Sequence, residues 1–139
     1  MSIRLFYDEV SFRLKGWAKV IEVINNVILN SGKTAGDINV IITDDQTLKE
    51  INVQFLKHNY FTDVITFNYC NDNVVNGEIY ISINTVERNA FNYNISLTEE
   101  IRRVIIHGVL HLVGYEDKLK REKILMKERE DFWLGKFKD

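Results

Sequence analysis

The order of strand-like and helix-like hydrophobic patterns is the feature that most constrains the fold of this chain. Runs of β-branched residues predict strands, and apolar residues at three- and four-residue steps predict amphipathic helices. The predicted strands cover residues 3–10, 37–43, 64–69 and 79–81. The predicted helices cover residues 14–30, 44–55, 85–91, 96–113 and 119–134. This order predicts an α+β fold, a compact unit in which about five helices pack on a small mixed four-stranded sheet.

Turn-forming residues separate the last two predicted strands. Asn71-Asp72-Asn73 and Asn76-Gly77 both have the chemistry of tight turns. The two strands on either side are therefore expected to be adjacent and antiparallel.

Length and composition restrict the class of protein. A chain of 139 residues can bury a core, and we expect a single domain over residues 1–139. Hydrophobic residues make up 45% of the chain, which excludes a disordered protein. The single cysteine favours a reducing cytoplasm, and no apolar run has the length of a signal peptide or a membrane span. The net charge of −2 excludes a globally basic nucleic-acid binder but leaves room for a local basic patch.

One stretch has the spacing of a metal site. His107 and His111 are four residues apart on a predicted helix, so both imidazoles point the same way. Gly114 can end that helix in the left-handed conformation, and Asp117 can then turn back towards the same cation. Glu116 is the competing acid, and the register favours Asp117.

Two imidazoles and one carboxylate form a common catalytic zinc set that leaves a fourth position open. Zinc lowers the pKa of its bound water towards about 7, so hydrolysis is the natural reaction class. The same ligand set also suits ferrous iron. A histidine pair at this spacing also occurs on helices that bind no metal, and the glycine turn and the acid are what favour a metal site.

The spacing also resembles the zinc protease pattern HExxHxxGxxH, in which the glutamate after the first histidine is the general base. Here that position is Gly108. A protease of that class would lack the group that deprotonates the attacking water, so it remains a minor alternative.

Three separated motifs resemble the YbeY family of bacterial rRNA maturation factors, which are metal-dependent endoribonucleases. The stretch from His107 to Asp117 is similar to the family signature HGxLHLxGYDH. Upstream, residues 62–67 (TDVITF) resemble the family's TDVLSF, and residues 77–82 (GEIYIS) resemble its GDIxIS. The resemblance covers about residues 37–131. It implies a compact α+β fold with the metal at the end of a cleft, and action on single-stranded RNA in ribosomal RNA processing and ribosome quality control.

The chain departs from the family pattern at two positions. The usual third histidine is Asp117, which preserves a ligand but changes its charge. An arginine thought to hold phosphate falls on Leu56 in our alignment with the motif. The neighbouring Lys57 and His58 could supply a cation or a proton-transfer group, although a lone loop histidine is more often ordinary surface. His58 is therefore a candidate catalytic side chain, and the metal with its bound water is the principal candidate for the catalytic group.

Ribosomal RNA, with the small ribosomal subunit, is the partner that the resemblance implies. Candidate phosphate-binding cations lie near the metal motif: Arg102, Arg103, Lys118, Lys120, Arg121 and Lys123. Interleaved acids, including Glu122, Glu128, Glu130 and Asp131, equally favour a solvated charged helix face. Tyr60, Phe61 and Tyr69 could stack on bases or belong to the core.

The missing arginine also leaves open a second hypothesis from a different class. The protein could be a ribosome-assembly binding factor whose metal is mainly structural. Asp63 and Glu78 are acids within the resembling motifs that could orient a ligand histidine, and Cys70 is interpreted as a packing residue.

Overall fold

The computed structural model of the protein describes residues 2–58 and 60–138. Its strands are β1 (Ser2–Tyr7), β2 (Thr34–Thr43), β3 (Val64–Asn68) and β4 (Val74–Ser82). Its α-helices are α1 (Trp17–Asn30), α2 (Asp45–Ile51), α3 (Ile83–Tyr93), α4 (Leu97–Leu112) and α5 (Lys120–Leu134). A π-helical turn, η1 (Asn52–Leu56), continues α2, and a 3₁₀ turn, η2 (Gly135–Phe137), follows α5. The predicted α+β fold with a four-stranded sheet and five helices is confirmed.

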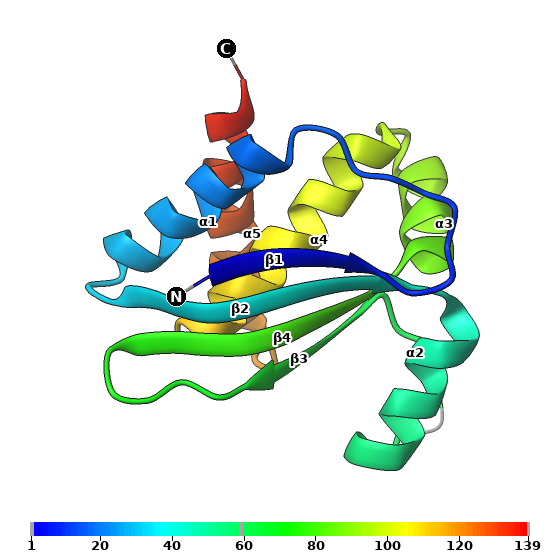
Figure 1. The fold of residues 1–139 in the computed structure, drawn as a ribbon. Coiled ribbons are helices and arrows are strands. Elements are labelled where there is room, and N and C mark those ends of the chain that lie inside the picture. Colours follow the sequence, from blue (N-terminus) through cyan, green and yellow to red (C-terminus); the bar gives the residue numbers. More distant parts are fainter. Residues whose placement is uncertain (1, 59, 139) are drawn as a thin grey trace.

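The strands form one mixed sheet in the order β1-β2-β4-β3 (Figure 1). β2 pairs in parallel with both β1 and β4, whereas β3 pairs antiparallel with β4. The prediction of two adjacent antiparallel strands is confirmed. Helices α1, α3, α4 and α5 lie on one side of the sheet, and α2 extends away from its end (Figure 1).

One predicted turn is wrong. Asn76 and Gly77 lie inside β4, and the chain reverses instead around Asn71, whose backbone bridges to Val74. β4 is consequently longer than predicted. Gly77 is required within the strand because a Cβ there would lie 2.7 Å from Cδ2 of Leu112 on α4. The glycine permits close helix–sheet packing rather than a turn.

Left-handed backbone residues shorten two further predicted elements. Strand β1 ends at Tyr7, because Glu9 adopts a φ of 54°. Helix α1 begins at Trp17 rather than at residue 14, since Gly16 precedes it with a φ of 76°.

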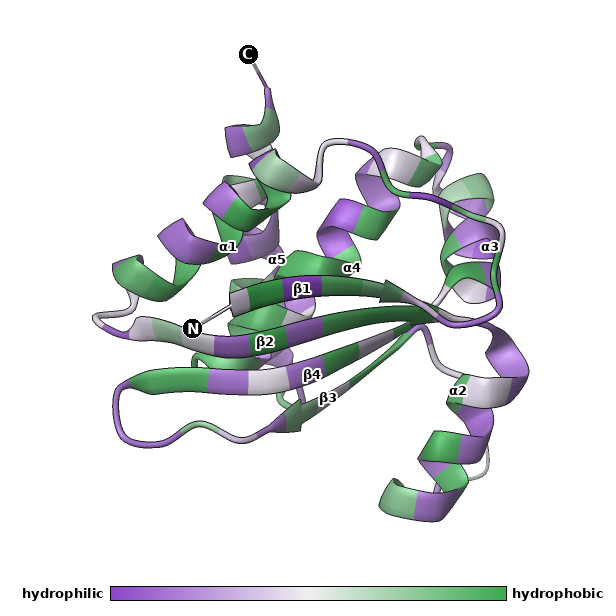
Figure 2. Ribbon diagram, viewed as in Figure 1, coloured by the Kyte–Doolittle hydropathy of each residue, from purple (hydrophilic) through white to green (hydrophobic). Residues whose placement is uncertain are grey.

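Helix α4 is the central element of the core. Its apolar side chains, among them Ile101, Ile105 and Val109, are buried against the sheet. Figure 2 shows hydrophobic residues on the α1, α4 and strand segments that face one another. A Cβ at Gly108 would lie 2.8 Å from Cγ2 of Ile79 on β4, so the glycine lets α4 pack closely on this side chain of the sheet. This close contact fixes the helix that carries both motif histidines.

No helix among residues 2–58 and 60–138 is both long and apolar enough to cross a membrane.

Candidate metal centre

Helix α4 places His107 and His111 one turn apart with their rings facing each other. The two Nε2 atoms are 3.0 Å apart, and the ring centroids are 4.5 Å apart at 84°. Ser96 caps the start of the helix by accepting a hydrogen bond from the backbone N–H of Glu99 at 3.1 Å. The predicted helical pairing of the histidines is therefore present in the structure.

Gly114 turns the chain back towards these rings. Its φ is 113°, a conformation that side chains other than glycine rarely adopt. The following residue, Tyr115, donates its backbone N–H to the carbonyl oxygen of Leu110 at 3.0 Å, which closes the turn. Asp117 then reaches the histidines, and its Oδ2 lies 3.4 Å from Nε2 of His107 and 3.3 Å from Nε2 of His111.

These three residues, which we call the His-His-Asp group, form a cluster that could hold a metal ion. Tetrahedral zinc with ligands at about 2.0–2.1 Å holds its ligand atoms about 3.3–3.4 Å apart. The three separations in this structure are close to that spacing. Glu116, the competing acid, is exposed and lies outside the group.

Hydrogen bonds on the far side of each ring determine which atoms face the centre. Nδ1 of His107 donates to Oε2 of Glu130 at 2.7 Å, and Nδ1 of His111 donates to the backbone oxygen of Tyr115 at 2.9 Å. In a neutral imidazole the other nitrogen, Nε2, then carries a lone pair. Two lone pairs and a carboxylate oxygen therefore converge on one point. Such acceptors repel one another unless they share a cation or a proton, so the donor set fits a metal ion.

Glu130 is a residue of this site that the sequence prediction missed. It is buried on α5, and its Oε1 accepts a hydrogen bond from Nη1 of Arg103 at 3.1 Å. Burial by itself lowers the pKa of His107, but the hydrogen bond and the charge of Glu130, together with the Asp117 and Asp63 carboxylates, raise that pKa above its ordinary value. The signal that could have found Glu130 is its spacing of four residues from Met126, which places both on the buried face of α5.

Two further acids lie behind the His-His-Asp group. Asp63, Glu100 and Glu130 share a cavity of about 240 Å³ with His107 and Asp117. Burial raises the pKa of Asp63, and burial raises the pKa of Glu100 to about 7. Oε1 of Glu100 has no hydrogen-bond partner among the described residues and lies 3.9 Å from Nε of Arg103. Of the two acids suggested from the sequence motifs, Asp63 therefore lies at the site.

The other acid, Glu78, lies elsewhere. It accepts a hydrogen bond from the hydroxyl of Tyr69 at 3.2 Å. Cys70 packs against the core, where its Sγ lies 3.4 Å from the backbone oxygen of Leu112, as expected for a packing residue.

An open groove of about 390 Å³ reaches the His-His-Asp group from the η1 side. We call it the His58 groove; its walls include Leu56, His58, Tyr60, Thr62 and Asp63. Nδ1 of His58 lies 3.0 Å from the hydroxyl of Tyr60, and the two rings stack at 5.2 Å. The catalytic candidate His58 therefore shares a groove with the His-His-Asp group.

The position expected for the family arginine, Leu56, also lines the His58 groove. Among the described residues that line this groove, none is an arginine or a lysine. Tyr60, Phe61 and Tyr69 are all more than half exposed, so they are surface rather than core residues.

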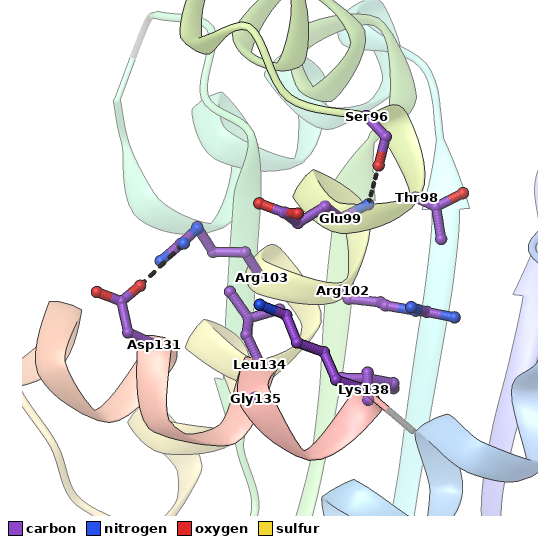
Figure 3. Close-up of a pocket in the computed structure, with 10 residues that line it drawn as sticks. Ser96, Thr98, Glu99, Arg102, Arg103, Asp131, Leu134, Gly135 and Lys138 are labelled. Carbon is purple, nitrogen blue, oxygen red and sulfur yellow. Dashed lines mark hydrogen bonds and ion pairs between the residues drawn. The ribbon is translucent and has the colours of Figure 1, made fainter.

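The two arginines of the predicted basic patch line one pocket, but their side chains point in opposite directions. Arg103 reaches Asp131, with Nη2 to Oδ1 at 2.9 Å, while Arg102 extends in the opposite direction (Figure 3). The guanidinium of Arg102 lies 4.5 Å from the ring centre of Phe137. Lys118, Lys120, Arg121 and Lys123 are exposed, as that prediction required.

The surroundings of Gly108 argue against the protease alternative, which requires a glutamate at this position. The Cα of Gly108 lies against Ile79, where even a Cβ would be too close. A glutamate base could occupy this position only if Ile79 or α4 shifted.

Three convergent donors at the edge of an open groove are typical of a hydrolytic enzyme rather than of a closed structural metal site. The family described as Endoribonuclease YbeY matches residues 6–138, and the chain belongs to this family. The enzyme class predicted from the sequence, an endoribonuclease, is confirmed by this membership.

Individual relatives show the same likeness. The chain is 43% identical over 132 residues to the Endoribonuclease YbeY of Flavobacterium psychrophilum, which covers 95% of this chain and 94% of the relative. It is 40% identical over 129 residues to that of Karelsulcia muelleri, covering 93% of this chain and 92% of the relative. A solution structure of a Thermotoga maritima protein is similar with a TM-score of 0.65 and 32% identity, over 97% of this chain and 88% of that one.

Proposed function

We propose that this protein is a zinc-dependent endoribonuclease that cleaves single-stranded ribosomal RNA, with His107, His111 and Asp117 as the metal ligands. The observation that carries the proposal is the convergence of three acceptor atoms, at separations of 3.0, 3.3 and 3.4 Å, beside an open groove. Membership of the YbeY family supports RNA as the substrate.

A divalent cation bound here would supply Lewis acidity towards a phosphate oxygen of the RNA. The protein's own residues prepare the site for it. Glu130 and the backbone oxygen of Tyr115 hold the two imidazoles in the tautomer that turns Nε2 inwards. Asp117 gives the site one more negative charge than a third histidine would, which favours cation binding and moderates Lewis acidity.

The His58 groove supplies groups for proton transfer. Asp63 and His58 both line it beside the His-His-Asp group. We assign the proton transfer to His58, whose contact with the Tyr60 hydroxyl orients its ring. Asp63 is assigned an electrostatic role, because its charge acts on His107.

The proposal extends to the setting that the family implies. We place the activity in the cytoplasm, on RNA of the small ribosomal subunit, in rRNA maturation and ribosome quality control. The chain offers no membrane-spanning helix among its described residues that would argue for another setting.

Leu56 favours one alternative function, that of a ribosome-assembly binding factor. Because it occupies the groove wall where the family pattern has an arginine, phosphate binding in the His58 groove lacks that cation. A ribosome-assembly factor with a mainly structural metal would not need it. The two functions differ in whether purified protein cuts RNA.

The test is cleavage of an end-labelled single-stranded RNA by zinc-loaded protein. We expect endonucleolytic products from the native protein and none from His111→Ala, with circular dichroism showing that the variant is folded. A 5′-phosphate on the products identifies water as the nucleophile, and a 2′,3′-cyclic phosphate identifies the RNA's own hydroxyl. Equal cleavage by His111→Ala would refute the metal-nuclease proposal, and absence of cleavage by the native protein would favour the assembly factor.

A further inference from the structure

A second groove reaches the His-His-Asp group from the α5 side. It has a volume of about 600 Å³, and most of its lining residues lie outside the site described so far. We call it the Tyr93 groove. Its walls include Tyr93, Ile95, Lys123 and Met126, and it ends at His107 and Asp117.

The end of α3 and the start of α5 place an aromatic ring and a cation on opposite elements of this groove. Tyr93 is the last residue of α3 and is 63% exposed. Lys123 lies on α5, is exposed, and has no ion-pair partner among the described residues. Met126, which is 2% exposed, adds an apolar surface.

The three acids of the groove, Glu99, Asp117 and Glu130, are matched in number by the cations Arg103, Lys123 and Lys127. Glu130 is already engaged by His107 and Arg103. Glu99 is exposed and is the one remaining acid of this lining outside the His-His-Asp group. A groove with a free lysine, an exposed tyrosine and an apolar wall suits a nucleotide, whose phosphate pairs with the cation and whose base stacks on the ring.

The two grooves share His107 and Asp117 but no other lining residue. An endonuclease must hold its strand on both sides of the bond that it cuts. We propose that the Tyr93 groove binds the nucleotides on one side of the scissile phosphate, with Tyr93 stacking on a base and Lys123 pairing with a phosphate. The His58 groove then holds the other side. This inference rests on the proposed function.

The test compares Tyr93→Ala and Lys123→Ala with matched controls on other surfaces. Phe91→Ala removes a neighbouring aromatic ring that is 85% exposed and does not line the groove. Lys19→Ala removes an exposed lysine of α1 that pairs with Glu22. The measurements are kcat and KM for cleavage of a short single-stranded RNA, and the affinity of metal-free protein for the same RNA by fluorescence anisotropy.

We expect Tyr93→Ala and Lys123→Ala to raise KM and to weaken binding roughly fivefold or more, with kcat within about twofold of native. The two controls should match the native protein. Shortening the RNA from the end that occupies the groove should remove the difference between Tyr93→Ala and native protein, while shortening from the other end should leave it.

Unchanged KM and affinity in both variants, with native protein active, would overturn the proposal and would instead indicate that the groove serves another partner. Inactivity of the native protein would contradict the proposed function itself. This outcome is distinct from failure of the groove proposal, because it is seen without any variant.

Discussion

Nδ1 of His107 on α4 lies 2.7 Å from Oε2 of Glu130 on α5, so α5 orients a proposed metal ligand although it supplies none itself. Glu130→Gln removes the charge and leaves a weaker hydrogen bond. We expect zinc affinity to fall roughly 10–100-fold, as measured by competition with a chromogenic chelator. Glu128→Gln, two residues away and exposed, should leave the affinity unchanged. Equal affinities for both variants would contradict the role given to Glu130.

Asp117 is the proposed ligand at which this chain departs from the family pattern. Asp117→Ala leaves two imidazoles, and we expect the purified variant to lose its bound metal in elemental analysis. Asp117→His restores a third donor and should retain the metal. Glu116→Ala is the matched control and should behave as native protein, since that side chain lies outside the group. A full metal complement in Asp117→Ala would disprove the ligand assignment.

His58 is the proposed proton-transfer residue. His58→Ala should lower kcat by about 100-fold while KM changes little, because the ring contributes to the chemical step. Added imidazole should restore part of the rate. Lys57→Ala is the neighbouring control, and it removes a cation without touching the imidazole. A native kcat in His58→Ala would transfer the role to Asp63.

Glu100 predicts a pH dependence of stability. Its pKa is raised by burial to about 7, so the folded protein binds its proton more tightly than the unfolded chain does. The contribution of Glu100 to the free energy of unfolding therefore falls as the pH rises from about 4.5 to 7 and is constant above that range. Glu100→Gln should remove this loss and gain about 3 kcal/mol relative to native protein between pH 4 and pH 8.

The measurement is urea unfolding of metal-free protein across this pH range. Glu99→Gln, the exposed neighbour, should follow the native curve. Parallel curves for native protein and Glu100→Gln would show that Glu100 titrates normally.

The contact between Gly108 and Ile79 predicts a cost for any side chain at this position. Gly108→Val should lower the free energy of unfolding by roughly 1–3 kcal/mol, because the added methyl groups force α4 away from the sheet. Gly135→Val is the control, since a Cβ there meets no atom within 4 Å. Urea unfolding measures both, and a stability of Gly108→Val equal to that of the control would contradict the close packing.

The His-His-Asp group could be predicted because its information is local. His107, His111 and Asp117 are joined by one helix and one glycine turn, and both features are visible in the spacing of a short motif. The pairing of β3 with β4 was predictable for the same reason, since the strands are close in sequence.

The spacing from Met126 could place Glu130 on the buried face of α5, but its role at the site depends on where α5 packs. In the sequence it is one acid among several on a charged helix, and only the tertiary contact with His107 distinguishes it. At Gly77 the sequence predicted a feature, a turn, that the structure does not have. Asn76-Gly77 has the composition of a turn, but both residues lie within β4, where Gly77 leaves room for Leu112.

The His107–Glu130 contact has a consequence for the C-terminal helix. A metal ion bound to Nε2 of His107 would fix the same imidazole ring that is hydrogen-bonded to Glu130. Metal binding and the docking of α5 are therefore thermodynamically linked. Loading the site should slow amide hydrogen exchange along α5, although this helix supplies no ligand. A bound cation would then hold α5 and the C-terminal turn that follows it against the rest of the protein.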